Sequence, residues 1–362
     1  MFRARSTALG ALLAGALAAG LAVGTPAATS APPEPAIPAI PAAQGVDPVV
    51  ADESADLKDR LAALDGVSSV TEATAAPGYR FFRMTFTQPV DHQHPKNGTF
   101  EQRITLLHKD TARPMVMYTG GYYVSQNPSR SEPTQLVDGN QLSMEYRFFD
   151  PSRPADPDWP EQLTIWQAAT DQHRIIESFQ DLYAANWLTT GGSKGGMTAT
   201  YHRHFYPKDV DGTVPYVAPN DVIDSEDVYN EFLDNVGTAG CRDAITALQR
   251  RVLGPDRAWF TDKTRTVSEE NDYTYEIVGD MDVAMESGVV DAFFAFWQYS
   301  PQSACDDIPD AATASNDEVW DWFEGVSPLT VYADQSVGFY TPYYYQAAYP
   351  VSYTHLTLPT KA

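Results

Sequence analysis

Residues 186–197 read NWLTTGGSKGGM, and they carry the strongest signal for the fold. Its first five residues predict a strand that enters Gly191, and the residues from Met197 to Pro207 predict a helix. The glycines between them allow a sharp, strained turn. Strand, tight turn and helix in this order predict a nucleophile elbow, which exposes a serine at the top of an α/β-hydrolase sheet.

Ser193 lies at the centre of this turn. A serine becomes a strong nucleophile when its oxygen is exposed and a base takes its proton, and an elbow meets the first condition. The backbone N–H of Lys194 would then be one oxyanion donor, and the glycine loop at Gly121 and Tyr122 stands where the second donor belongs. An ordinary glycine turn is the alternative, which the extra flanking glycines and the upstream glycine loop disfavour.

Segments before the elbow supply the rest of the predicted sheet. Residues 79–90 and 100–107 alternate apolar and polar side chains, which indicates two strands joined by a turn at 97–98. Residues 114–118 form a short apolar run that ends in the glycine loop, and residues 163–182 have helical spacing. We expect an α/β fold over residues 52–220, namely an α/β-hydrolase core.

The N-terminus predicts export. Two arginines precede an apolar run over residues 7–24, and small residues follow, so residues 1–31 read as a secretory signal peptide. An uncleaved membrane anchor is the alternative. Residues 32–51 are rich in proline and predict an extended linker or propeptide. We expect a secreted, extracellular protein.

The composition and the predicted secondary structure of the chain change after the predicted core. Acidic, amphipathic helical stretches fill residues 221–345, and we interpret them as a helical cap inserted over the site. The whole chain carries 48 acidic and 24 basic residues. This balance argues against nucleic acid and anionic membranes as partners, and it suits positively charged substrates. We expect a monomer that binds neither nucleic acid nor membrane.

Cys241 and Cys305 are the only cysteines. In an oxidising compartment an even count most simply predicts a disulfide, although two free thiols are an open alternative. Neither C-x-x-C spacing nor a cluster of histidine and aspartate is present. We therefore expect no metal site and no cofactor.

Several segments together resemble the secreted actinobacterial tripeptidyl and tetrapeptidyl aminopeptidases, relatives of lysosomal prolyl carboxypeptidase and the dipeptidyl peptidases. The resemblance covers about residues 50 to 350. Its matching segments are QPVDH (88–92), FEQR (100–103), YTGG (118–121), EYRFF (145–149), LT (163–164), QAATD (167–171) and GGSKGGM (191–197). The resemblance implies a serine peptidase that releases short peptides, often containing proline, from free N-termini beneath a helical cap.

An exopeptidase of this kind needs a carboxylate to pair with the ammonium group of its substrate. Glu145 is one candidate for that role. Its segment could equally support the oxyanion loop through Arg147, so both roles stay open.

The catalytic acid and base should follow the serine in the order Ser, Asp, His. His202 and His204 would lie about 13 to 16 Å along the helix from Ser193, which is too far for a base. His355 belongs to residues 351–362, a tail without acidic residues that we interpret as non-native sequence, with a short native tail as the alternative. The resemblance implies that the acid and the base lie well beyond this point, in loops after the last strands of the sheet. We therefore expect a C-terminally truncated chain that lacks those strands and the Asp and His of the triad.

Two other functions compete with the peptidase. A secreted esterase or acyltransferase would carry the same elbow, and a non-catalytic binding protein could use a degenerate hydrolase fold. The segments that carry the resemblance favour peptide substrates over both.

Overall fold

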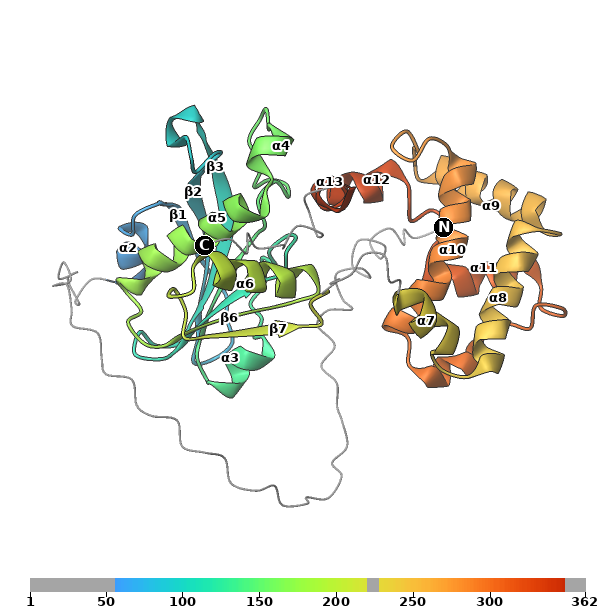
Figure 1. Ribbon diagram of the computed structural model, residues 1–362, viewed down its shortest axis with the longest axis horizontal. Coiled ribbons are helices and arrows are strands. Elements are labelled where there is room, and N and C mark those ends of the chain that lie inside the picture. The colour runs from blue at the N-terminus through green and yellow to red at the C-terminus, as the bar shows by residue number, and fades with distance from the viewer. Residues whose placement is uncertain (1–55, 220–227, 349–362) are drawn as a thin grey trace, which may run out of the picture. The chain divides into compact units, whose positions relative to one another are not determined.

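The computed structural model describes residues 56–219 and 228–348. The predicted signal peptide, the proline-rich segment and the tail at 351–362 lie outside the described residues. The described chain divides into two compact units, which are treated separately below. The helical unit holds residues 233–264 and 285–329, and the sheet unit holds the other described residues (Figure 1).

The sheet unit is built on one mixed sheet with the strand order β1-β2-β3-β5-β4-β6-β7. The first three strands and the β3–β5 pair are antiparallel, whereas β5, β4, β6 and β7 run parallel. The strands are β1 (Val67–Ala73), β2 (Arg80–Pro89), β3 (Thr99–His108), β4 (Met115–Thr119), β5 (Asn140–Met144), β6 (Trp187–Gly192) and β7 (Gly212–Tyr216). This topology, with an elbow after β6, is the predicted α/β-hydrolase fold.

The helices predicted over residues 163–182 and 197–207 are present as α5 and α6 with slightly different bounds. The α-helices are α2 (Leu57–Ala62), α3 (Glu132–Leu136), α4 (Trp159–Gln162), α5 (Ile165–Gln180), α6 (Lys194–Phe205), α7 (Val228–Asn235), α8 (Ala239–Leu253), α9 (Arg257–Glu270), α10 (Met281–Tyr299), α11 (Asn316–Val326), α12 (Asp334–Val337) and α13 (Thr341–Ala348). Short 3₁₀ helices lie at Pro95–Asn97, Gln302–Asp307 and Gly338–Tyr340.

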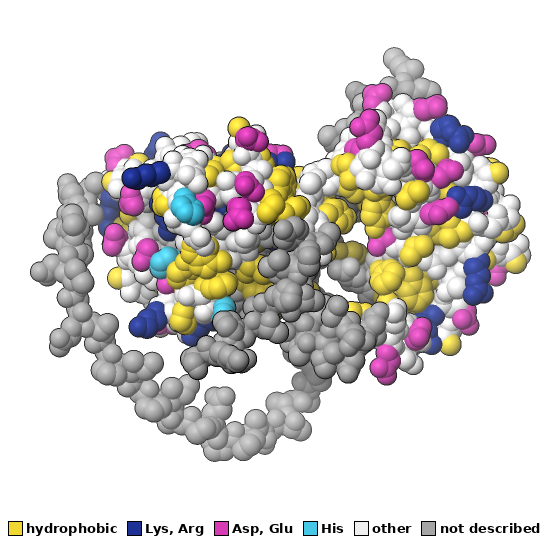
Figure 2. Space-filling model, turned by 45° about the horizontal axis from the view of Figure 1, so that its top comes forward, with side chains coloured by type: hydrophobic (Ala, Val, Ile, Leu, Met, Phe, Trp, Pro, Cys, Tyr) yellow, Lys and Arg dark blue, Asp and Glu magenta, His cyan; other side chains and the backbone are white. Residues whose placement is uncertain are grey.

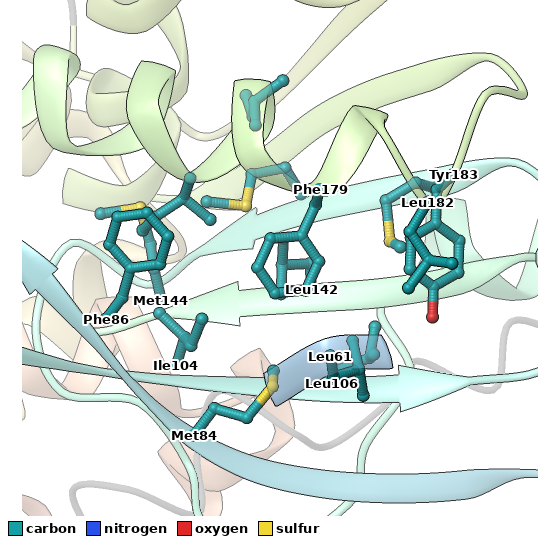
Figure 3. Packing of buried hydrophobic residues seen from close by; sticks show 14 of the residues in the cluster. Leu61, Met84, Phe86, Ile104, Leu106, Leu142, Met144, Phe179, Leu182 and Tyr183 are labelled. Carbon is teal, nitrogen blue, oxygen red and sulfur yellow. The ribbon is translucent and has the colours of Figure 1, made fainter. Parts of the chain in front are cut away.

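The main core lies between the sheet and α5. Ile176 and Phe179 on α5 are fully buried with Leu106, Met117 and Leu142, which come from three neighbouring strands. Figure 3 shows Phe179 beside Leu142 and next to the side chains of β2 and β3. Burying one such side chain contributes about 1.5–3 kcal/mol. This packing fixes β4 and β6, the two strands that carry the site.

The helical unit has a separate core around α8 and α10. Ile245 and Phe296 are buried there, and Cys241 packs beside them. Cys241 and Cys305, the pair expected from the cysteine count, form a disulfide with a Cα–Cα distance of 5.4 Å. The disulfide links α8 to the 3₁₀ helix at Gln302–Asp307.

The expected boundary of the cap at 221–345 differs from the division in the structure. Residues 265–284 and 330–348 belong to the sheet unit. Residues 330–348 join it by aromatic packing, because Tyr340 and Tyr343 pack against a cluster that contains Tyr146, Phe148 and Phe149. Residues 265–284 pack in turn against this segment, with Tyr275 and Ala284 beside Ala333. Sequence periodicity shows that such a stretch is helical but does not show which core it joins.

The surface carries many more acidic than basic side chains, and Figure 2 shows them spread over the visible face of both units. Across the described ranges, no helix combines the length and apolar character that a membrane crossing requires. Within the same ranges, no group of three or more histidine, cysteine or acidic side chains could hold a metal ion.

Candidate active site

Ser193 occupies the turn between β6 and α6 with φ 53° and ψ −124°. A positive φ is unusual for a residue other than glycine and stores about 1–3 kcal/mol of strain. Two hydrogen bonds hold the turn: the Ser193 N–H donates to the Tyr216 carbonyl at 3.0 Å, and the Met197 N–H donates to the Ser193 carbonyl at 3.0 Å. The strained, fixed serine is the arrangement that the sequence predicts for a nucleophile elbow.

The glycines around Ser193 are required by close backbone contacts. A Cβ atom on Gly191 or Gly195 would overlap the carbonyl oxygen of Thr119, the last residue of β4. The end of β4 therefore lies directly against the elbow. This contact brings the loop that follows β4 to the start of α6.

Gly120, Gly121 and Tyr122 form this loop, called the oxyanion loop below. A Cβ on Gly121, where φ is +74°, would lie 2.7 Å from the Lys194 carbonyl carbon and 2.8 Å from the Gly195 nitrogen. No hydrogen bond within the described residues uses the Lys194 N–H, whereas the Gly121 N–H donates to Thr119 Oγ1 at 3.3 Å. The structure thus brings together the three residues predicted to form the oxyanion hole, Lys194, Gly121 and Tyr122.

Glu145 is fully buried and is occupied by protein partners. Its carboxylate accepts a hydrogen bond from Arg103 Nε at 2.7 Å and another from the Val124 N–H at 3.4 Å. Burial raises the pKa of Glu145, although Arg103 and Ser152 donate to it. This geometry favours support of the chain after β4, through the hydrogen bond from Val124, over contact with a substrate ammonium.

Arg147 forms a separate buried pair that the sequence did not indicate. Its Nε and Nη2 atoms each donate to the carboxylate of Asp171 on α5 at 2.7 Å, and both side chains are fully buried. His92 Nε2 lies 2.7 Å from Asp171 Oδ1. Burial alone would raise the pKa of Asp171, but Arg147 and His92 hold it below its usual range. The pair fixes the 145–147 segment on α5.

The Tyr146 backbone connects this segment to the oxyanion loop. Its N–H donates to the Tyr122 carbonyl at 2.7 Å. The chain on each side of Tyr146 is held by a charge pair, of which Arg147–Asp171 is fully buried and Arg103–Glu145 is partly buried, so the loop is attached to a rigid part of the sheet unit.

Comparison with known proteins assigns this site to a family. The sequence profile of PS-10 peptidase S37 matches residues 50–361. Prolyl tri/tetrapeptidyl aminopeptidase of Streptomyces mobaraensis is 48% identical over 357 residues, which cover 98% of this chain and 69% of the relative. The chain belongs to the peptidase S37 family.

Solved structures show weaker likeness to this S37 peptidase. Acetyl xylan esterase 1 from Thermoanaerobacterium sp. JW/SL YS485 aligns with a TM-score of 0.33 and 12% identity, over 49% of this chain and 60% of the esterase. A post-proline cleaving enzyme from Rickettsia typhi aligns with a TM-score of 0.28 and 13% identity, over 41% of this chain and 26% of that enzyme. The family assignment therefore rests on the sequence matches.

The histidines described for this S37 peptidase have partners away from Ser193. His202 Nε2 lies 2.9 Å from Asp209 Oδ2 and is fully buried, while His204 is exposed beside Phe205. The others contact acidic or tyrosine side chains: His92 with Asp171, His94 with Asp91, His108 with Tyr183, and His173 with Asp209. Within residues 56–219 and 228–348, no hydrogen bond joins a histidine to Ser193. His355 lies outside these residues.

Proposed function

We propose that this S37 peptidase is an exported serine aminopeptidase that releases peptides of three or four residues, often containing proline, from free N-termini. The observation that carries the proposal is the serine elbow at Ser193 in a chain 48% identical to a prolyl tri/tetrapeptidyl aminopeptidase. The elbow provides the nucleophile, and the substrate class is proposed from the activity that the relative is named for.

The reaction would proceed through an acyl-enzyme. Ser193 Oγ attacks the carbonyl carbon of the scissile bond while a base takes the hydroxyl proton. The negative charge that develops on the carbonyl oxygen is stabilised by the Lys194 N–H and by donors of the oxyanion loop. The base returns the proton to the leaving amine, and water then hydrolyses the ester on Ser193.

The charge of the protein supports a cationic substrate. An excess of acidic side chains attracts a free N-terminal ammonium over long range. Glu145 is neutralised by Arg103, so we propose that another carboxylate contacts the ammonium directly.

Export and a monomeric state belong to the same proposal. The signal-peptide pattern in residues 1–31 and the Cys241–Cys305 disulfide both support an oxidising, extracellular location. N-terminal sequencing of protein from the culture medium should begin after residue 31, and light scattering should give the mass of one chain. Intact protein confined to the cell would contradict export.

Substrate choice separates the peptidase from the competing functions. The full-length protein should cleave a proline-ending tripeptide p-nitroanilide with a free N-terminus, and Ser193→Ala should remove this activity. The N-acetylated form of the same peptide should be a poor substrate because it lacks the ammonium. Hydrolysis of p-nitrophenyl esters of fatty acids without cleavage of the peptide would establish an esterase instead. A folded protein inactive on every substrate would favour the non-catalytic binding protein.

A further inference from the structure

The side chain of Lys194 is buried beside the nucleophile in an unusual environment. The residue is only 5% exposed, and within the described residues its ammonium forms neither a salt bridge nor a hydrogen bond. Burial holds the pKa of the amine well below its usual range. Lysine is seldom buried without a carboxylate, because the charged form loses its hydration. The cost of burying this amine must therefore be offset by another contact.

Its contact is the face of an aromatic ring. Lys194 Nζ lies 3.2 Å from the ring centroid of Tyr146 and 5.7 Å from the ring centroid of Tyr122. The negative face of the ring attracts the charged form of the amine, and this attraction offsets part of the cost of burying it. The cavity beside the amine has a volume of ≈ 10 Å³, about the least that holds one water molecule. The contacts that the structure gives to the amine are therefore with the protein's own aromatic rings.

Lys194 is connected to the oxyanion loop by two routes, one through its backbone and one through its side chain. Its backbone packs against Gly121, its ammonium lies on the ring of Tyr146, and the Tyr146 N–H donates to the Tyr122 carbonyl at 2.7 Å. Gly121 and Tyr122 are consecutive, so both routes end on the same loop. A shift of the Lys194 side chain would therefore change the separation between the Lys194 N–H and the oxyanion loop.

Tyr146 offers a fixed surface for this contact. Gln346 Nε2 donates to the Tyr146 hydroxyl at 3.0 Å and to the Leu163 carbonyl at 3.1 Å. The neighbours of Tyr146 in the chain are held by the partly buried pair Arg103–Glu145 and the fully buried pair Arg147–Asp171. The ring therefore cannot follow a displaced lysine, and the position of the ammonium is set by the protein frame.

We propose that the Lys194 side chain is a positioning residue for the oxyanion hole, in which the contact of its ammonium with the Tyr146 ring holds the oxyanion loop against the N-terminus of α6. The inference rests on the proposed acyl transfer at Ser193. It gives Lys194 two separate roles, because the N–H contacts the reacting oxygen and the side chain sets where that N–H stands relative to the second donor. The amine does not act as the base, since it faces the ring and forms no hydrogen bond with Ser193.

A positioning role predicts a loss in kcat with little change in KM. The oxyanion forms in the transition state, so displaced donors slow the chemical step while the bound substrate is affected little. Loss of a whole oxyanion donor lowers the rate about 100- to 1,000-fold. Lys194→Met keeps the N–H and the length of the side chain but removes the charge, so we expect a smaller reduction of kcat, about 10- to 100-fold.

Variants of Tyr146, whose ring contacts the Lys194 amine, provide the second part of the experiment. Tyr146→Leu should reduce kcat by a similar factor, and the double variant should be no slower than the worse single variant, because both remove one contact. Tyr146→Phe keeps the ring and should be at least tenfold faster than Tyr146→Leu. Lys263→Met is the matched control, since Lys263 Nζ lies 5.9 Å from the Trp320 ring in the helical unit. A kcat for Lys194→Met within twofold of wild type, or additive losses in the double variant, would overturn the proposal.

A second readout separates this inference from the proposed function. The rate at which a fluorophosphonate reacts with Ser193 depends on the nucleophile and the oxyanion hole but requires no peptide recognition. If wild type reacts with the reagent but cleaves no peptide, the proposed substrate class is wrong, and the labelling rates of the variants still test Lys194. If Lys194→Met fails to fold, as judged by thermal unfolding, the comparison of Tyr146→Phe with Tyr146→Leu decides. Equal rates for these two would overturn the positioning role.

Discussion

Replacing Gly121 by alanine perturbs the oxyanion loop at its tightest contact. Gly121 and Gly78 have similar φ values, +74° and +85°, so alanine adds a similar backbone strain of about 1–2 kcal/mol at either position. The surroundings differ, because nothing lies within 4 Å of a Cβ at Gly78. At Gly121 the new Cβ would lie 2.7 Å from the Lys194 carbonyl carbon. The loop must therefore move away from α6 in the Gly121→Ala variant alone.

The size of the effect follows from this displacement. Carbon atoms pack at about 3.5–4.0 Å, so relief of the overlap moves the loop by about 1 Å. A misplacement of that size in a catalytic site lowers the rate about 100-fold, which corresponds to about 2.7 kcal/mol in the activation free energy. The Gly78→Ala variant should share the loss in stability and keep the wild-type rate.

The assay is kcat on the tripeptide p-nitroanilide, measured together with the thermal unfolding of each variant. We expect both variants to unfold at a lower temperature than wild type, with a large reduction of kcat for Gly121→Ala only. A folded Gly121→Ala protein with a rate within about threefold of Gly78→Ala would refute the assignment of this loop to the oxyanion hole.

Three further predictions concern stability. Asp171→Asn should lower the free energy of unfolding by about 3–5 kcal/mol, measured by urea denaturation, because it leaves the Arg147 charge buried without its partner; a loss below 1 kcal/mol would contradict this. Burial lowers the pKa of His173, but its hydrogen bond to Asp209 leaves it raised overall, while the pKa of Asp209 is lowered. The pair should therefore stabilise the fold most between about pH 4 and 6.5, where Asp209 is ionised and His173 is protonated. The free energy of unfolding of wild type should exceed that of His173→Gln most within this window, and the difference should become smaller at lower and at higher pH. A difference independent of pH would show that the pair is not coupled. Replacing both cysteines by serine should cost about 4 kcal/mol, because the cysteines are 64 residues apart and the disulfide restricts the unfolded chain; unchanged unfolding of the helical unit would exclude this contribution.

The elements that carry the nucleophile could be predicted from the sequence. The alternating residues 79–90 and 100–107 correspond to β2 and β3, and the strand and helix around Ser193 correspond to β6 and α6. These segments have strong periodicity and turn residues with a definite backbone role. The grouping of Lys194, Gly121 and Tyr122 followed from the known geometry of an elbow.

Strand β5 could not be predicted, because three of its five residues are polar. Asn140, Gln141 and Ser143 are buried in the middle of the sheet and satisfied by hydrogen bonds. The Asn140 carboxamide accepts from the Lys109 N–H at 2.7 Å, and Gln141 Oε1 accepts from the Ser131 N–H at 2.7 Å. Such partners are distant in the chain, and hydrophobic periodicity carries no signal for them.

The contacts that hold the site in place could not be predicted from the sequence either. Arg103–Glu145 and Arg147–Asp171 join residues 42 and 24 positions apart. The ring contact of Lys194 joins α6 to the 145–147 segment, and ordinary preference places a lysine at the surface. Only the folded arrangement shows that the residue after the nucleophile has a buried side chain.

Covalent labelling of the full-length protein with a fluorophosphonate, followed by mass spectrometry of its peptides, tests directly whether Ser193 is the nucleophile. We expect one label per chain on the peptide that contains Ser193, and no label on Ser193→Ala with an unchanged unfolding temperature. Labelling at another residue, or equal labelling of wild type and Ser193→Ala, would contradict the assignment of Ser193 as the nucleophile.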